Sequence, residues 1–196
     1  MRKIVLVIVM LIVVCIGLTA QNKPNGLNVN AVAPDFTAKD QSGKMINLKS
    51  VLKKNEVVMV FYRGQWCPFC NKELKALEDS LQWISSKGAI VLAISPEVPE
   101  NITKTIEKTK ASYSILYDDG LKIMKSYDVA FPVDSLTISK YKTYGIDFTV
   151  ANGATNGNNL PVPAVYVINK KGIITYRHFD PDYRKRASIK EIVSHL

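Results

Sequence analysis

The sequence predicts one α/β domain in which buried strands alternate with amphipathic helices. The chain has 196 residues, of which 47% are apolar and 22% are charged. A chain of this size can bury about 70% of its unfolded surface in one core, and this composition excludes collagen-like, low-complexity and disordered chains. Residues 57–62 and 89–94 are apolar, β-branched runs of strand length, and an amphipathic helical pattern separates them. Strands and helices that alternate in this way imply parallel strand pairing.

Residues 1–20 have the pattern of an export signal. Two basic residues, an apolar run and a pair of small residues ending at Ala20 follow one another, and the run is short for a membrane span. We expect cleavage after Ala20, which leaves an irregular lead-in at residues 21–31 and a domain at residues 32–196. The alternative is an uncleaved membrane anchor. The domain is predicted to be exported to the periplasm or cell envelope, with membrane contact only through this segment.

The charge balance of the chain is basic, but the basic residues are not concentrated. Lys and Arg number 26 against 17 Asp and Glu, and removal of residues 1–20 would lower the net charge from +9 to +7. Because the basic residues are scattered along the chain, we interpret them as solvated surface and expect no nucleic-acid partner.

The first half of the domain is predicted to hold a hairpin, two strands and one helix. The turn sequence DQSG at residues 40–43 indicates a hairpin across residues 36–48. After the strand at residues 57–62, apolar residues recur every three or four positions from Cys70 to Ile84. This spacing predicts a single helix, which ends at Gly88 before the next buried strand.

The second half is predicted from turn signals and shorter patterns. The expected elements are helices at 100–110, 121–127 and 187–196, a strand at 114–117, and an antiparallel hairpin at 164–178. Between them, residues 131–160 contain Asn-Gly and Asn-Asn pairs, which are typical of loops. We therefore predict a long surface loop there, with one helical piece near residues 138–144.

Residues 63–70 (RGQWCPFC) lie between the central strand and the amphipathic helix and hold both cysteines of the predicted mature chain. A structural zinc site needs about four ligands, and no second cysteine pair is available. Covalent haem needs a histidine after the second cysteine, where Asn71 stands. A structural disulfide remains an alternative, although so short a loop adds little stability. The motif favours a redox dithiol at a strand-to-helix turn, with no metal and no cofactor.

Cys67 is predicted to be the N-cap of this helix, with Pro68 at the first helical position, where a missing N–H has no cost. The free N–H groups and the helix dipole favour a thiolate, but the dipole alone hardly makes it dominant at neutral pH. Arg63 could supply the remaining stabilisation of the thiolate, since a nearby unit charge contributes about 3 kcal/mol before screening. Trp66 and Phe69 are expected to shield the sulfurs and to form an apolar lip for a protein partner.

Three stretches of the chain form a specific combination: residues 32–36 (VAPDF), 61–70 (FYRGQWCPFC) and 161–168 (PVPAVYVI). Together they resemble the peroxiredoxin-like branch of the alkyl hydroperoxide reductase/thiol-specific antioxidant family. The resemblance extends from about residue 32 to the C-terminus. It implies an antioxidant oxidoreductase with the thioredoxin fold, a central mixed sheet flanked by helices, and an N-terminal peroxiredoxin-type hairpin extension.

The active-site pattern departs from that family, which carries P-x-x-x-T-x-x-C and a later arginine that activates the peroxidatic cysteine. Arg63 stands at the proline, Cys67 at the threonine and Cys70 at the peroxidatic cysteine. Pro163 stands opposite the activating arginine. Cysteine and proline at those two places resemble thioredoxins, in which the proline follows a cis bond. We therefore expect a cis Val162–Pro163 bond that presents the Val162 backbone to a partner strand. An ordinary strand-entry proline is the alternative.

The first functional hypothesis is an exported, thiol-dependent redox enzyme. Cys67 attacks a protein disulfide and Cys70 resolves it, or the pair reduces a hydroperoxide through a sulfenic acid. Which cysteine would be peroxidatic stays open, because alignment favours Cys70 and thiolate exposure favours Cys67. The expected electron donor is a thioredoxin-like protein or a membrane thiol reductase.

Two alternatives remain. One is a thioredoxin-like thiol–disulfide oxidoreductase without peroxidase activity. The other is a redox-inert binding module with a structural Cys67–Cys70 bridge, in which the basic surface and residues 131–160 hold a partner. A reduction potential well below about −300 mV would support the second. His178 and His195 are interpreted as surface residues. Tyr183, Arg184 and Arg186 could bind anions, but we favour a solvated C-terminal segment.

Overall fold

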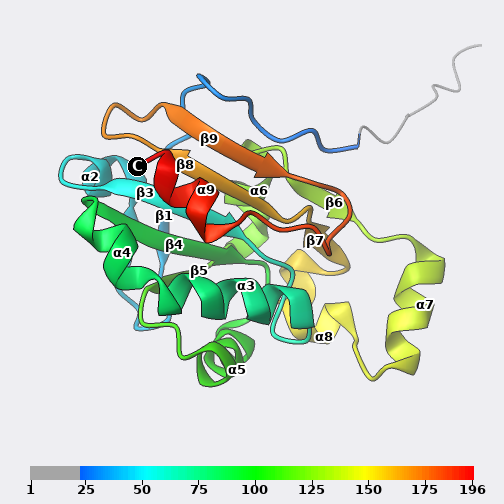
Figure 1. Ribbon diagram of the computed structural model, residues 1–196. Helices are drawn as coiled ribbons and strands as arrows, with labels where there is room; N and C mark the ends of the chain where they lie inside the picture. The colour runs from blue at the N-terminus through cyan, green and yellow to red at the C-terminus, as the bar shows by residue number, and fades with distance from the viewer. Residues whose placement is uncertain (1–22) are drawn as a thin grey trace, which may run out of the picture.

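The computed structural model describes residues 23–196, so the predicted export segment and its cleavage site lie outside the described residues. Figure 1 shows a central sheet with helices on both sides. No helix within this part of the chain combines the length and apolar character needed to cross a membrane. The lead-in is bonded to the domain, since the N–H of Gly26 donates to Asp128 O and that of Asn30 donates to Ile174 O.

The main sheet has five strands in the order β5-β4-β3-β8-β9. The central strand β3 (Glu56–Phe61) is parallel to β4 (Ala89–Ser95) and antiparallel to β8 (Ala164–Ile168). The outer strands are β5 (Ser114–Tyr117), parallel to β4, and β9 (Ile174–Phe179), antiparallel to β8. The predicted parallel pairing and the predicted hairpin at the far end are therefore both confirmed.

Side chains of β3 alternate between two apolar cores, as the strand period of two requires. Met59 packs into one core and Val60 into the other, and neither is exposed to solvent. Around the core that holds Val60 lie α3 (Pro68–Asp79), α4 (Leu81–Ser86), α5 (Pro99–Thr109) and α9 (Ile189–Ser194). The opposite core is covered by α2 (Leu48–Leu52) and α6 (Lys122–Ser126), the latter after the 3-10 turn η1 (Asp119–Leu121).

The N-terminal hairpin is confirmed as β1 (Thr37–Lys39) and β2 (Met45–Asn47). The helix α2, which follows at once, was not predicted; the Asn47 side chain caps it by accepting from the Ser50 N–H at 2.8 Å. The single helix predicted from Cys70 to Ile84 is wrong, because α3 and α4 are separate. The helical conformation is interrupted at Ser80, whose φ of −106° and ψ of 6° are not helical.

The helical piece expected near residues 138–144 is confirmed. The long loop predicted over the rest of residues 131–160 is wrong. The segment folds as α7 (Ser135–Thr143) and α8 (Phe148–Asn156), enclosed by the two-stranded ribbon β6 (Ala130–Pro132) and β7 (Asn159–Pro161). The asparagines that indicated turns make buried bonds instead: the Asn156 amide donates to Pro96 O at 2.7 Å and to Asp118 O at 3.0 Å. Figure 1 shows α7 projecting beyond the edge of the sheet.

Candidate active site

The cysteine pair lies where β3 ends and α3 begins, in the core that α3 and α9 share. Cys67 is the N-cap of α3, as predicted, with φ −90° and ψ 109°. Its Sγ accepts from the Cys70 backbone N–H at 3.3 Å, and Pro68 occupies the first helical position. The first sulfur is therefore held against the positive end of the helix, where a thiolate is favoured.

Both cysteines are free thiols, and neither is exposed to solvent. The Cys70 thiol donates to Cys67 Sγ across 2.6 Å. The two sulfurs are thus close enough to form a disulfide with a small displacement.

Arg63 is buried beside Cys67, with only 6% of its surface exposed. Its Nη2 donates to Cys67 Sγ at 3.3 Å and its Nη1 donates to Tyr141 Oη at 3.3 Å. The guanidinium lies 3.7 Å from the centre of the Tyr183 ring and 5.0 Å from that of Trp66. The structure thus brings together three predicted residues, Arg63, Trp66 and Cys67, with a tyrosine from α7 and one from the C-terminal segment.

The surroundings give the two thiols different pKa values. The hydrogen bond from the Cys70 thiol and the Arg63 guanidinium lower the pKa of Cys67 to about 6, against the opposing effect of burial. Burial raises the pKa of Cys70 well above its usual range, and a Cys67 thiolate beside it raises that pKa further. At neutral pH the pair therefore holds one thiolate, on Cys67, and one proton, on Cys70.

A second arginine, Arg186, contacts the second sulfur. Its Nη2 donates to Cys70 Sγ at 3.4 Å and its Nη1 to Glu73 Oε2 at 2.6 Å. Burial raises the pKa of Glu73 to about 7 although Arg186 lowers it. The interpretation of Tyr183 and Arg186 as solvated surface is wrong, because the segment after β9 returns across the start of α3. Arg184 is exposed, as predicted.

A second buried carboxyl, Glu97, supports the loop before Cys67. Its Oε2 accepts from the Gln65 N–H at 2.7 Å, and burial raises its pKa to about 8. The loop passes so close that a Cβ on Gly64 would lie 2.6 Å from Glu97 Oε1 and 2.5 Å from Trp66 Nε1. Only glycine fits at this position.

Replacing Glu97 by glutamine should flatten the pH dependence of stability. The folded-state pKa of Glu97 is raised, so its contribution is full below the unfolded pKa near 4.3 and is lost as pH rises towards 8. Glutamine resembles the protonated acid. Between pH 5 and pH 9 the free energy of unfolding of E97Q should increase relative to that of the wild type by up to about 4 kcal/mol in urea unfolding. The exposed Glu100→Gln is the control; parallel curves for wild type and E97Q would contradict the assignment.

The predicted cis bond before Pro163 is wrong: the peptide bond from Val162 to Pro163 is trans. The β6–β7 ribbon holds this stretch extended up to the start of β8, and the Val162 N–H donates to Val129 O at 2.8 Å. Val162 is also buried. Its N–H is therefore not available to a partner strand, and Pro163 is an ordinary strand-entry proline.

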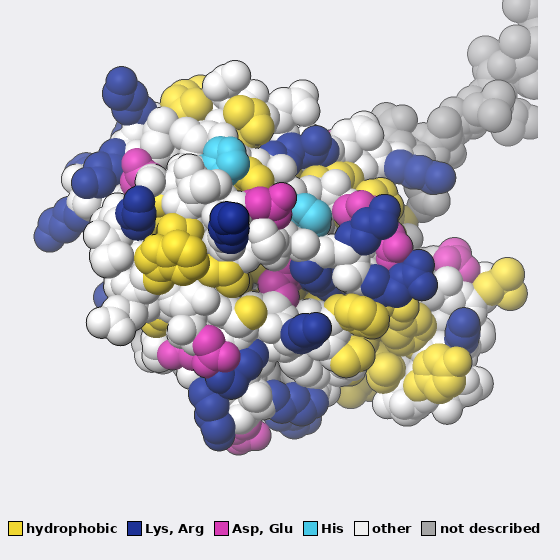
Figure 2. Space-filling view, in the orientation of Figure 1, with side chains coloured by type: hydrophobic (Ala, Val, Ile, Leu, Met, Phe, Trp, Pro, Cys, Tyr) yellow, Lys and Arg dark blue, Asp and Glu magenta, His cyan; other side chains and the backbone are white. Residues whose placement is uncertain are grey.

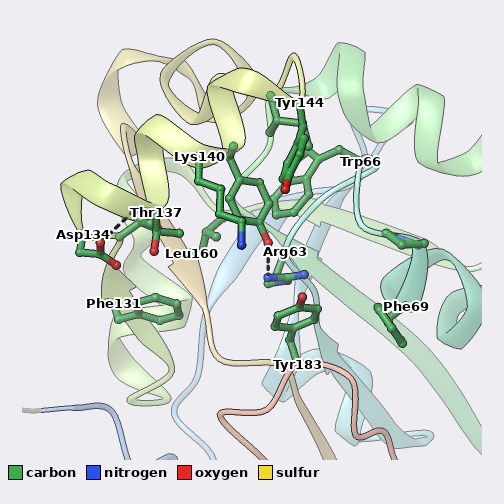
Figure 3. A pocket seen from close by; sticks show the side chains of 14 residues that line it. Arg63, Trp66, Phe69, Phe131, Asp134, Thr137, Lys140, Tyr144, Leu160 and Tyr183 are labelled. Carbon is green, nitrogen blue, oxygen red and sulfur yellow. Dashed lines mark hydrogen bonds between the residues drawn. The ribbon is translucent and has the colours of Figure 1, made fainter.

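A pocket of about 590 Å³ opens beside Arg63, between α7 and the start of α3 (Figure 3). Its walls are largely aromatic, from Trp66, Phe131, Tyr141, Tyr144 and Tyr183. A second hollow of about 480 Å³ shares Arg63 and Tyr183 with this pocket and includes Val162 and Pro163. Figure 2 shows apolar side chains gathered over the α7 end of the molecule, whereas Lys and Arg are dispersed.

The described residues contain no group of three metal-ligating side chains. The two histidines lie away from the cysteines: His178 is near Lys185 O, and His195 packs on the Tyr176 ring at 4.7 Å.

The sheet order, together with a cysteine pair at the start of the helix after the central strand, defines a thioredoxin-fold protein. Peroxidoxin BcpB from Mycobacterium tuberculosis has this fold, with a TM-score of 0.66 at 18% identity over 86% of this chain and 96% of that one. The thioredoxin domain of a thiol-disulfide oxidoreductase from Bacteroides vulgatus gives 0.55 at 20% identity, over 81% and 93% of the two chains. The predicted fold is confirmed.

The chain belongs to the AhpC/TSA family, whose model matches residues 29–177. The chloroplastic peroxiredoxin Q of Populus jackii is 30% identical over 148 residues, 76% of this chain and 58% of that protein. The same protein of Triticum aestivum is 29% identical over 165 residues, 83% of this chain and 65% of its own length. The chain therefore spans less than two thirds of the length of these relatives, and the resemblance seen in the sequence is confirmed.

Proposed function

We propose that this protein is a dithiol oxidoreductase that reduces hydroperoxides, with Cys67 as the attacking sulfur and Cys70 as the resolving one. The observation that carries the proposal is the setting of Cys67 Sγ, which accepts from Arg63 Nη2 and from the Cys70 N–H. These contacts support a thiolate, with a pKa of about 6, beside a protonated partner. Membership of the AhpC/TSA family supports the redox class.

In the first step the Cys67 thiolate attacks the terminal oxygen of the hydroperoxide. An S–O bond forms and the O–O bond breaks, so that Cys67 becomes a sulfenic acid. The alkoxide leaves and takes a proton from solvent water to become the alcohol. Arg63 stabilises the thiolate before attack and remains beside the oxygen where charge develops. The Cys70 sulfur then attacks Cys67 Sγ and the disulfide forms. The hydroxide displaced from the sulfenic acid takes the Cys70 proton and leaves as water. Two thiols of an electron donor restore the pair.

Access to the sulfurs requires movement of the side chains that cover them. Both cysteines are fully buried, and the rings of Phe69 and Tyr183 pack edge to face at 5.7 Å beside the pocket. We infer that a substrate displaces one of these rings. Phe69 is partly exposed at the start of α3, where the sequence predicted an apolar lip.

Reduction of protein disulfides is a second candidate, favoured by the C-x-x-C spacing and by Pro163 where the family has its activating arginine. The same sulfur would act, since only Cys67 carries the thiolate. A mixed disulfide on Cys67 would replace the sulfenic acid, and Cys70 would release the reduced substrate. The electron donor in either case is a thiol protein or a membrane thiol reductase.

Cysteine-to-serine variants test both candidates side by side. C67S should lose hydroperoxide reduction and disulfide reduction together. C70S should consume one equivalent of hydroperoxide per chain without turnover, leave a dimedone-reactive sulfenic acid on Cys67, and trap a mixed disulfide with a protein substrate. The two variants are matched controls, because each removes one fully buried sulfur.

A sulfenic acid on Cys70 in C67S, formed at the wild-type rate, would contradict the assignment of the first nucleophile. A wild-type reduction potential well below about −300 mV would instead support the structural bridge.

We also propose that the protein works after export, as its first 20 residues suggest. Sequencing the N-terminus of the protein from its native cell should give Gln21 as the first residue, in an extracytoplasmic fraction. Recovery of the uncleaved chain in the cytoplasm would contradict this proposal.

A further inference from the structure

Arg63 is a buried cation whose anionic contact depends on the redox state of the protein. Its Nη2 contacts Cys67 Sγ, and no carboxylate within residues 23–196 forms an ion pair with it. Its Nε has no hydrogen-bond partner, although only 6% of the residue is exposed. When Cys67 enters a disulfide, its sulfur loses the negative charge. A buried guanidinium then remains without a counter-charge, which is strongly unfavourable.

The pocket of about 590 Å³ offers a place for a replacement anion, because Arg63 forms part of its lining. Lys140, on α7, extends into this pocket on the side that faces Arg63 (Figure 3). One carboxylate, that of Asp134, also lines the pocket, but it caps α7 by accepting from the Thr137 N–H at 2.9 Å. The aromatic walls suit an organic anion better than a fully hydrated inorganic one.

We propose that the oxidised protein binds a carboxylate between Arg63 and Lys140, and that its thiol electron donor carries such a carboxylate close to the thiol. This inference rests on the disulfide cycle proposed above. It adds the chemical class of the electron donor that reduces the disulfide in that cycle. The donor carboxylate would take over the contact that the Cys67 thiolate makes in the reduced form. Arg63 would thus be paired with an anion in the reduced form and again while the donor is bound.

The reductive half then proceeds in two balanced steps. The donor thiolate attacks Cys67 Sγ, which forms a mixed disulfide and releases the Cys70 sulfur; Cys70 takes up a proton next to Arg186. A second donor thiolate attacks the donor sulfur of the mixed disulfide. The oxidised donor leaves as its disulfide, and the Cys67 thiolate returns to Arg63. The protein gains two electrons, and two donor thiols lose them.

Direct binding tests the anion site without any turnover. The protein is oxidised with diamide, the Cys67–Cys70 disulfide is verified by mass, and 3-phenylpropionate is titrated by calorimetry at low salt into the oxidised and reduced forms. The oxidised form should bind about tenfold more tightly or better. The neutral 3-phenylpropanol should not distinguish the two forms. Equal affinity of the carboxylate for both forms would overturn the proposal.

Lys140 can be tested separately because it is exposed and takes no part in the thiol chemistry. K140Q should weaken binding to the oxidised form by about three- to tenfold. The matched control is K142Q on the same helix, since Lys142 is paired with Asp147 at 3.1 Å; it should bind as the wild type does. Unchanged binding in K140Q would overturn the assignment of this residue.

Reduction rates connect the site to the electron donor. Per thiolate, 3-mercaptopropionate should reduce the disulfide faster than its methyl ester, and the ratio should fall towards one in K140Q. A ratio of one in the wild type would overturn the carboxylate requirement while the proposed function stood. Failure of diamide to form the disulfide would instead count against the proposed function itself, so the two failures are distinguishable.

Discussion

Replacing Arg63 by methionine should make the protein react about tenfold more slowly at pH 7, whether the reagent is a hydroperoxide or iodoacetamide. Methionine fills a similar volume between the rings of Tyr183 and Trp66 but removes the charge beside Cys67. An opposite charge at this distance lowers a pKa by about 1–3 units. The Cys67 pKa should therefore rise from about 6 towards the usual value of a thiol near 8.5.

The pH profile of alkylation distinguishes this electrostatic effect from damage to the fold. In the wild type the alkylation rate should rise with a midpoint near pH 6; in R63M the midpoint should move up by about 1–3 pH units. Above about pH 10 the variant should react as fast as the wild type, because Cys67 is then ionised in both proteins. A low rate at every pH would contradict the assigned role. Arg184→Met, at an exposed arginine of the C-terminal segment, is the matched control.

Replacing Arg186 by methionine should lower the free energy of unfolding by about 2–4 kcal/mol at pH 8. The change leaves the Glu73 carboxyl buried without the ion pair that Arg186 now provides at 2.6 Å. The Glu73 pKa, already about 7, should rise further. A carboxyl whose pKa is raised in the folded state makes the protein less stable as pH rises. The difference in free energy of unfolding between R186M and the wild type should therefore be small at pH 5 and grow towards pH 8.

Urea unfolding of four proteins measures this effect: wild type, R186M, E73Q and the double variant. E73Q in the R186M background should recover most of the lost stability at pH 8, since it removes the unpaired charge. Arg184→Met is again the control, and breaking its exposed pair with Asp182 should leave the urea midpoint close to that of the wild type. Equal losses at pH 5 and pH 8 would show that Arg186 acts through packing.

The sequence predicted those parts of the site that are local in the chain. Cys67 at the N-cap, Pro68 at the first helical position and Arg63 beside the first sulfur all lie within eight consecutive residues. Helix capping and charge act over that range, so residue type and spacing were sufficient. The five strands of the main sheet were predicted for a similar reason, since buried strands are short apolar runs.

The sequence did not show the contacts that arise only from the tertiary fold. Arg186 is 116 positions from Cys70 and Tyr141 is 78 positions from Arg63, and neither carries a local signal of its neighbour. A basic residue in a polar C-terminal segment is usually solvated. Tyr183, which stacks on Arg63, stands in the charged segment 180–186 (DPDYRKR), and nothing in that segment indicates the contact.

Two predictions failed because a residue type had another role in the fold. Asn-Gly pairs indicated a loop at residues 131–160, but Asn152 and Asn156 donate to backbone carbonyls and fix α8 instead. The cis bond before Pro163 was expected by resemblance to thioredoxins. In this chain the Val162 N–H donates to Val129 O beside the β6–β7 ribbon, and the backbone before β8 is extended.

The assignment of Cys67 as the ionised, attacking sulfur can be tested most directly by mapping which cysteine reacts first. The reduced wild-type protein is treated at pH 7 with less than one equivalent of iodoacetamide, and the modified residue is located by peptide mass spectrometry. Modification should fall on Cys67, with Cys70 unlabelled, because one sulfur holds the charge and the other holds the proton. Equal labelling, or labelling of Cys70 first, would contradict the account.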